Sequence, residues 1–193
     1  MIKRLFDTLV AALAGLLLAP LMAVIAICVR RDSAGPAIFR QERIGRGGEP
    51  STLLKFRSMA SGPVSAGPRV TAATDSRITK IGARLRDTKL DELPQLINVV
   101  RGDMSIVGPR PHALIHDEKF SSMLEDYANR HQVKPGITGL AQVNGLRGET
   151  RTHDSIRERV DHDMAYIRAW SLSLDLKIIA RTLFVVFTGK NAH

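Results

Sequence analysis

The pattern of hydrophobic and polar residues begins with an uncharged apolar stretch near the N-terminus. The residues from Leu9 to Val29 carry no charge, and as a straight helix they would be roughly 32 Å long, enough to cross the hydrocarbon core of a bilayer. Basic residues flank the stretch on both sides, so the positive-inside rule draws both of its ends toward the cytoplasm. These flanking cations are Lys3, Arg4, Arg30 and Arg31.

Pro20 lies at the centre of this stretch. Proline removes one intrahelical hydrogen bond and bends the axis. A helix that enters the membrane, breaks at Ala19-Pro20 and returns to the same face would satisfy both charged flanks. We favour this re-entrant helix-break-helix over a spanning helix, although spanning helices also tolerate proline. A cleaved signal peptide is the third alternative, but Ile27-Cys28-Val29-Arg30 is a poor small-residue cleavage site.

We therefore assign residues 1–31 to a re-entrant membrane helix and residues 32–193 to a cytoplasmic domain. In that domain, residues 37–39 and 53–56 are predicted to form a small β-hairpin around a glycine-rich turn. The elements predicted after it are a helix capped within Thr74–Ser76, a helix over Leu93–Arg101 that Gly102 ends, a strand at Ser105–Val107 and a helix over Ala113–Arg130. The fold class is thus α+β, mostly helical, in a monotopic membrane protein.

A last apolar stripe runs through the C-terminal region at helical spacing. Its members are Leu176, Ile179, Leu183 and Val186. The pattern fits a helix lying in the membrane interface and a core helix equally well. The domain assignment takes the first alternative and gives the cytoplasmic domain interfacial amphipathic helices.

The charge of the chain implies an anionic partner. The 193 residues include 28 Lys and Arg against 19 Asp and Glu, which gives a net charge of +9 and a pI of about 10.3. Nucleic acid, anionic lipid headgroups and nucleotide substrates all fit this balance. The single cysteine, Cys28, excludes an intrachain disulfide and favours a reducing, cytoplasm-facing domain.

Two adjacent carboxylates, Asp91 and Glu92, lie within the sequence Leu90–Leu96. Five cations lie near them in the sequence: Arg84, Arg86, Lys89, Arg101 and Arg110. A carboxylate can attack a phosphoryl centre only if the charge of that centre is neutralised, and arginines with a divalent ion can do this. The alternative is structural, with Asp91 as a helix N-cap, Glu92 in the first turn and Pro94 where no backbone donor is needed.

Three further segments carry candidate chemistry. Arg110 lies between two prolines, which stiffen it for holding a phosphate. The glycine-rich segment from Lys134 to Gly145 is predicted either to approach a nucleotide or sugar closely or to be an ordinary turn-rich connection. His112 and His116 have the i, i+4 spacing of metal ligands, but without a flanking Glu in the zinc-protease arrangement a metal site is not favoured.

Six motifs in one order resemble the bacterial sugar transferases, the monotopic phosphoglycosyl transferases that start membrane glycan assembly. Following the apolar N-terminal stretch, they are Gly35–Gly45, Lys55–Met59, Leu90–Leu96, Arg101–Ser105, Gly108–Pro111 and Pro135–Gly139. The resemblance covers nearly the whole chain. It implies an enzyme that transfers a sugar 1-phosphate from a UDP-sugar to polyprenyl (undecaprenyl) phosphate and releases UMP, with Mg²⁺ as cofactor, as the first membrane step of exopolysaccharide or glycoconjugate assembly.

The resemblance also implies residue roles. Asp91 would be the nucleophile that takes the phosphosugar covalently, and Glu92, beside it, the main ligand of the Mg²⁺ site that the pair forms. The substrate-binding candidates are Arg110, Arg86, Lys55, Arg57, Gln142 and Arg147. The segment Asn144–Thr150 is similar to the branch that transfers glucose or galactose 1-phosphate.

We expect the enzyme at the inner (cytoplasmic) membrane, with its catalytic domain on the cytoplasmic face and with membrane lipids but no nucleic acid as partners. The sequence leaves the oligomeric state open, and a homodimer is one alternative. Two other functions remain to be weighed. A membrane-tethered module that binds nucleic acid or anionic lipid would show a salt-steep affinity without UMP release. A magnesium-dependent UDP-sugar diphosphatase would consume its substrate without lipid.

Overall fold

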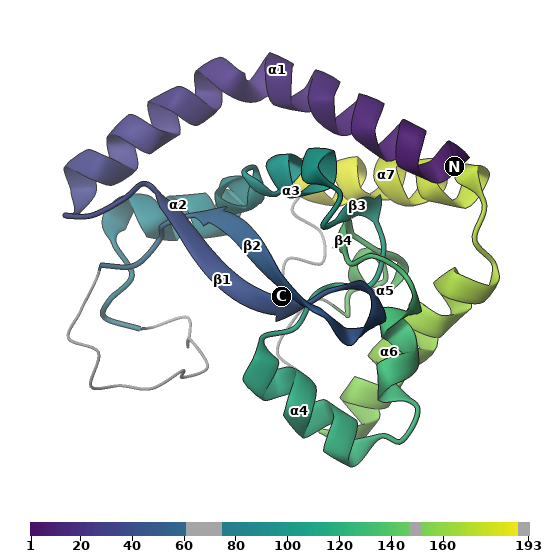
Figure 1. Ribbon diagram of the computed structural model, residues 1–193. Coiled ribbons are helices and arrows are strands. Elements are labelled where there is room, and N and C mark those ends of the chain that lie inside the picture. Colours follow the sequence, from purple (N-terminus) through teal and green to yellow (C-terminus); the bar gives the residue numbers. More distant parts are fainter. Residues whose placement is uncertain (61–74, 147–151, 189–193) are drawn as a thin grey trace.

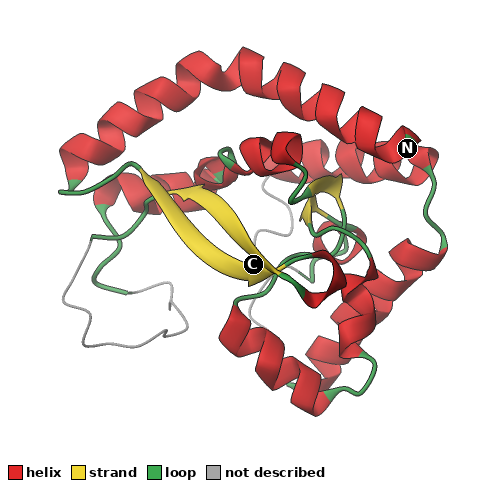
Figure 2. Cartoon of the chain, viewed as in Figure 1, coloured by secondary structure: helices red, strands yellow, loops and turns green. Residues whose placement is uncertain are grey.

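The computed structural model describes residues 1–60, 75–146 and 152–188 (Figure 1). Helices dominate it, with two small two-stranded sheets (Figure 2). The helices are α1 (Ile2–Asp32), α2 (Lys80–Thr88), α3 (Gln95–Arg101), α4 (Leu114–Met123), α5 (Leu140–Val143), α6 (His153–Arg168) and α7 (Leu172–Thr188). Short 3₁₀ turns are η1 (Arg46–Gly48), η2 (Leu90–Glu92) and η3 (Tyr127–Gln132), and the strands are β1 (Ile38–Ile44), β2 (Pro50–Phe56), β3 (Ser105–Val107) and β4 (Gly136–Thr138).

Helix α1 contains Pro20 and continues through it. The predicted break is therefore a bend: Figure 1 shows α1 bowed over the domain, with both of its ends turned toward the other elements. Among the described helices, α1 alone is long and apolar enough to cross a membrane. Large apolar side chains are exposed along it at Leu5, Leu9, Leu13, Leu16, Leu17, Val24 and Ile27.

The first turns of α1 are held to the domain by charged side chains. Lys3 forms an ion pair of 2.8 Å with the fully buried Asp175 of α7. Asp7, itself buried, accepts hydrogen bonds from the Ser105 hydroxyl and the Ile106 backbone N–H of β3. Arg4 donates to the Val99 and Val100 carbonyls at the end of α3, where the helix leaves carbonyl groups without intrahelical partners.

The last turn of α1 is held to the same domain. Arg57, which directly follows β2, donates to the Val29, Ser33 and Ala34 carbonyls. Asp32 accepts from the backbone N–H of Ile81 in α2. Both ends of the apolar helix are therefore bound by polar contacts to one folded unit.

The predicted hairpin is confirmed, and its strands are longer than the prediction. β1 and β2 pair antiparallel from Ile38 opposite Phe56 to Ile44 opposite Pro50. Asn98, fully buried in α3, bonds to the Leu54 N–H and the Thr52 carbonyl, so the hairpin is attached to the helix that follows the carboxylate pair.

Two predicted helix boundaries were wrong. Helix α2 begins after Thr79, whose hydroxyl accepts from the Gly82 N–H, while the carboxylate of Asp75 bonds instead to its neighbour Arg77. The helix predicted over Ala113–Arg130 is two elements, because the chain becomes extended at Leu124 and Tyr127 turns into the core. By contrast, α3 ends where predicted, with Gly102 in the left-handed region.

The glycines of the Lys134–Gly145 segment allow two backbones to touch. β4 pairs parallel with β3. A Cβ on Gly136 would lie 2.1 Å from the Gly108 nitrogen, and one on Gly139 would lie 2.3 Å from the Gly108 carbonyl oxygen. These two glycines let the backbone of β4 and of the residue after it lie against Gly108, so the Gly108–Pro111 loop is held next to β4.

The buried apolar residues form three clusters. One joins Ala11 of α1 to Val99 of α3 and Ile178 of α7, and a second joins Ile25 and Val29 of α1 to the hairpin and α2. The third packs α6 against α4 and η3. Helix α7 buries Ile178 but exposes apolar side chains on its other side, namely Leu176, Leu183, Phe184 and Val186.

Candidate active site

Asp91 and Glu92 occupy the turn η2, between α2 and α3, and each is only 8% exposed. The residue before this turn, Lys89, has a φ of 60° and is the single non-glycine residue with positive φ among those described. The N-cap position of α3 belongs to Pro94, and no side chain caps it. The N-cap interpretation of Asp91 is therefore wrong, and the pair stands in a tight turn that the fold presents to two cations.

Those cations are Lys55 of β2 and Arg110 of the loop after β3. The Lys55 ammonium lies 3.1 Å and the Arg110 guanidinium 2.7 Å from the same oxygen, Glu92 Oε1. The charge of Glu92 raises the pKa of Arg110. Burial, by contrast, lowers the pKa of Lys55, despite the opposing charges of Glu92 and Asp91.

The pKa of Asp91 shifts in the opposite direction to that of Lys55. Burial raises the pKa of its carboxyl, and the charge of Glu92 acts in the same direction, while Lys55, Arg110 and Arg86 lower it. A raised pKa makes a carboxylate more basic, and more nucleophilic once it is ionised. Of the predicted site residues, the structure thus brings Asp91, Glu92, Lys55 and Arg110 together, with Arg86 close enough for its charge to act on Asp91.

The other predicted site residues lie elsewhere or outside the described residues. Among the described residues, Arg57 donates hydrogen bonds to carbonyls at the end of α1 and not to the carboxylate pair. Gln142 donates to the Ile137 carbonyl, while its buried Oε1 has no hydrogen-bond partner among the described residues. Arg147 lies outside the described residues.

The carboxylate pair fits a magnesium ion by the chemistry of its donors. Mg²⁺ prefers oxygen ligands and is usually held by one or two carboxylates, with waters and substrate phosphates completing its octahedron. Within residues 1–60, 75–146 and 152–188, no group of three or more His, Cys, Asp or Glu side chains could hold a metal. Asp91 and Glu92 therefore suit a metal that arrives with a phosphate ligand.

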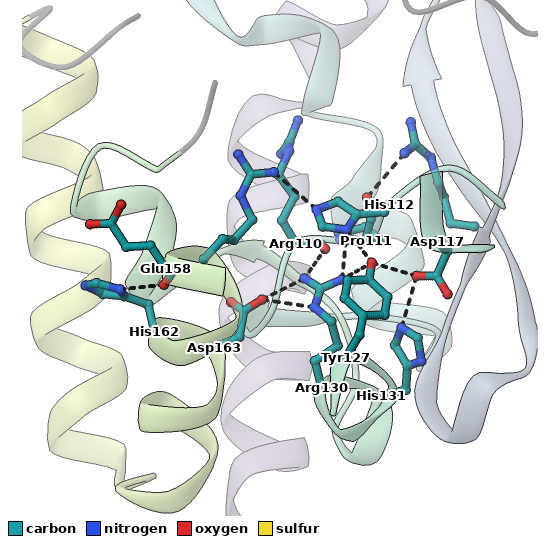
Figure 3. A network of polar contacts seen from close by, with 12 residues as sticks. Arg110, Pro111, His112, Asp117, Tyr127, Arg130, His131, Glu158, His162 and Asp163 are labelled. Carbon is teal, nitrogen blue, oxygen red and sulfur yellow. Dashed lines mark hydrogen bonds and ion pairs between the residues drawn. The ribbon is translucent and has the colours of Figure 1, made fainter. Parts of the chain in front are cut away.

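Behind Arg110 lies a buried polar network that the sequence did not predict (Figure 3). Arg130 of η3 donates to the Arg110 carbonyl at 2.7 Å and forms a buried ion pair with Asp163 of α6 at the same distance. Burial by itself would lower the pKa of Arg130. The charges of Asp163 and Tyr127 outweigh this effect, so the pKa of Arg130 is raised. Arg130 therefore fixes the backbone of Arg110, the residue whose side chain reaches Glu92.

His112, two residues after Arg110, is neutral in this network. Burial, and then the charges of four arginines, lower its pKa well below 6.5. Arg159 can only donate, so His112 Nε2, at 3.2 Å from it, accepts. Nδ1 lies 3.1 Å from the Arg130 guanidinium and 2.5 Å from the Tyr127 hydroxyl, which donates to Asp117.

Two more arginines, Arg43 and Arg159, lie near Arg110. They are not among the site residues predicted from the sequence. Burial, and then the charge of Arg110, lower the pKa of Arg43 to about 10, and burial with Arg110 and Arg130 lowers that of Arg159 to about 10. Arg43 also donates to the Pro111 carbonyl at 3.3 Å. The surroundings of Arg110 are thus rich in positive charge, which suits an anionic ligand with several charges.

The buried ion pair should matter far more for stability than an exposed one. Replacing Asp163→Asn leaves Arg130 as a buried charge without its carboxylate, which typically costs about 3–5 kcal/mol. Asp126 is the matched control, because its pair with Arg157 is about 40% exposed on both side chains. Asp126→Asn should cost less than about 1 kcal/mol. Thermal unfolding of the two variants in detergent measures this, and equal shifts would contradict the role of Asp163.

His112 should make stability depend on pH. The unfolded chain binds a proton at this residue as the pH falls through about 6.5, while the folded protein does not. The free energy of unfolding should therefore be unaffected above about pH 7.5 and decrease below about pH 6.5, by up to about 1.4 kcal/mol per pH unit. His112→Gln should make this decrease shallower, as urea unfolding at a series of pH values would show.

The control variant is His153→Gln. The His153 side chain is 55% exposed, so its replacement should leave the pH dependence of the free energy of unfolding as in the wild type. If His112→Gln left this pH dependence unchanged, the pKa of His112 would be the same in the folded and the unfolded protein, which would contradict the prediction.

The sequence matches a known protein family along almost its whole length. The model of the bacterial sugar transferase family matches residues 1–189. The UDP-glucose:undecaprenyl-phosphate glucose-1-phosphate transferase of Klebsiella pneumoniae is 51% identical over 99% of this chain, and that of Escherichia coli strain K12 is 50% identical over the whole of this chain. The chain spans only 41% and 42% of these two proteins.

A third relative is an exopolysaccharide production protein of Rhizobium leguminosarum. It is 41% identical over 94% of this chain, which covers 93% of that protein. The match of the family model, over residues 1–189, includes α1, the hairpin, the carboxylate turn and the loop of Arg110. The chain belongs to the bacterial sugar transferase family.

Proposed function

We propose that this protein transfers a sugar 1-phosphate from a UDP-sugar to polyprenyl phosphate, with undecaprenyl phosphate as the acceptor, and releases UMP. The observation that carries the proposal is the η2 turn, where two buried carboxylates face Lys55 and Arg110. The names of the Klebsiella and Escherichia relatives agree with this chemistry and favour glucose as the sugar. A nucleic-acid-binding module would not need an acidic pair amid its cations.

The reaction proceeds in two displacements at one phosphorus. In the first, an Asp91 oxygen attacks the phosphorus that bears the sugar, an acyl phosphate bond forms and the bond to UMP breaks. In the second, a phosphate oxygen of the acceptor attacks the same phosphorus, a diphosphate bond forms and the Asp91 carboxylate is released. Splitting one exchange into two steps lets a soluble donor and a lipid acceptor use the same site in turn.

The neighbouring residues hold and neutralise the diphosphate. Arg110, with its backbone fixed by Arg130, and Lys55 both point at Glu92, and both can turn to the phosphate oxygens of the donor. A Mg²⁺ ion bound by Glu92 and Asp91 would cancel further charge on the diphosphate and make UMP a better leaving group. The buried turn keeps water from the acyl phosphate, which distinguishes the transferase from a diphosphatase.

The proposal includes a re-entrant membrane helix at the cytoplasmic face of the inner membrane. It is supported by the polar contacts of both α1 ends with one domain, through Asp7 with β3 and through Arg57 with the last turn. A spanning helix would have to break one of these two sets of contacts. The exposed apolar side chains of α1 and α7 would then contact lipid.

Asp91→Asn should abolish turnover, because an amide is a poor nucleophile toward phosphorus. Purified protein with magnesium is assayed for UMP release from a panel of UDP-sugars, with and without undecaprenyl phosphate. The wild type without acceptor should release at most about one UMP per enzyme and carry sugar phosphate on the protein, because the intermediate waits for its second substrate. Intact-protein mass spectrometry after a mild acid quench detects that adduct.

Added undecaprenyl phosphate should discharge the adduct into lipid-linked product. Asp87→Asn, an exposed neighbour on α2, is the control and should keep wild-type activity. UMP release only with lipid and no adduct would favour direct attack by the acceptor. Continuous release without lipid would identify a diphosphatase.

The ends of α1 should both face the cytoplasm. In a Cys28→Ser background, single cysteines replace Ile2, which is 70% exposed, or Arg30, which is also exposed. An impermeant maleimide should label neither cysteine in intact spheroplasts and both after permeabilisation. Labelling of one end alone from outside would show that α1 spans the membrane.

A further inference from the structure

Helix α1 packs against the domain in two places and bows away from it between them. In the first place, Ala11 is buried against Val99 of α3 and its neighbours. In the second, Ile25 and Val29 pack with Leu85 of α2 and with the hairpin. Between the two lies Gly15, where an added Cβ would meet no atom within 4 Å.

The bow leaves an apolar groove of about 490 Å³ between α1 and α3. Its α1 wall includes the small residues Ala12, Gly15 and Ala19, and its α3 wall includes Leu96, Ile97 and Val100. The side chains of Ile97 and Val100 are 40% and 42% exposed, although they lie on a helix that is otherwise packed into the core. None of the described residues that line the groove is charged, so its chemistry suits a hydrocarbon and not a nucleotide.

The α3 wall of the groove is close to the candidate active site along the chain. Helix α3 begins at Gln95, and only Leu93 and Pro94 separate it from the turn of Asp91 and Glu92. The apolar neighbours of the pair, Leu90 and Leu93, pack toward the second half of α1. The two carboxylates contact the cations, so one short segment has a charged side for phosphate and an apolar side toward α1.

We infer that this groove binds the isoprenoid chain of the acceptor lipid next to its phosphate. The inference rests on the proposed function, in which the acceptor phosphate must reach Asp91 while its chain stays out of water. The uncharged residues of α1 and the exposed side chains of α3 provide an apolar path that ends at this turn. The small residues at Ala12, Gly15 and Ala19 leave the room that a methyl-branched chain requires.

The test fills the groove from either wall. Gly15→Leu and Ile97→Phe are made in the full-length protein and assayed in lipid nanodiscs, with undecaprenyl phosphate and with geranyl phosphate as acceptors. Apolar binding scales with the buried area, so the long chain should lose more than the short one. We expect kcat/KM for undecaprenyl phosphate to fall about tenfold or more, and that for geranyl phosphate by less than about twofold.

A control variant separates the groove from the helix itself. Leu16→Phe adds bulk at the next position of α1, which is 74% exposed and does not line the groove. It should use the two acceptors as the wild type does. The retained rate with geranyl phosphate shows in the same assay that the filled variants are folded.

Three results would overturn the inference. If the filled variants use undecaprenyl phosphate normally, the chain lies elsewhere. If both acceptors lose activity equally, the groove supports the structure or holds a phospholipid chain. If the wild type transfers to neither acceptor, the proposed function fails and the inference fails with it, whereas the first two results leave that function standing.

Discussion

Two carboxylates can be buried side by side only where cations offset their charge, and this constraint organises the whole molecule. Glu92 meets it by accepting from Lys55 and Arg110 at one oxygen. Those two cations come from the hairpin and from the loop after β3, so both elements must be placed accurately around η2. Asn98 attaches the hairpin to α3, and the close contacts of Gly108 with Gly136 and Gly139 lock the loop against β4.

The same constraint explains why so much buried charge lies behind the site. In the proposed function, Arg110 must keep its position when a multiply charged ligand exchanges with Glu92, and a loop held only by its own backbone would move. Arg130 and Asp163 provide a fixed support, since their ion pair is almost fully buried and one of its donors holds the Arg110 carbonyl. The neutral His112 then links this support to Tyr127 and Asp117 without adding another positive charge.

Elements whose sequence pattern lies within a few consecutive residues could be predicted from the sequence. The hairpin and the end of α3 at Gly102 each carry a pattern within a few residues, and the structure has both. The carboxylate pair also stands out locally, and the structure places Lys55 and Arg110 beside it. The network of Arg130, Asp163 and His112 joins segments far apart in the chain, so only tertiary packing could reveal it. Arg57 shows a different limit: a cation in a motif can serve a phosphate or the carbonyls at a helix end, and its residue type does not distinguish them.

Helix α1 is long and apolar enough to cross a membrane, and it is also attached to the elements that hold the candidate site. Lys3, Arg4 and Asp7 bind its start to α7, α3 and β3, and Arg57 binds its end. A straight helix of this length could not keep both attachments; α1 bends over the domain (Figure 1) and contains Pro20, a residue that favours bending. The bend places an uncharged surface over the α3 wall, directly beside the turn of Asp91. In the proposed function, a soluble and a lipid substrate would then approach one phosphorus from two sides of a single turn, one charged and one apolar.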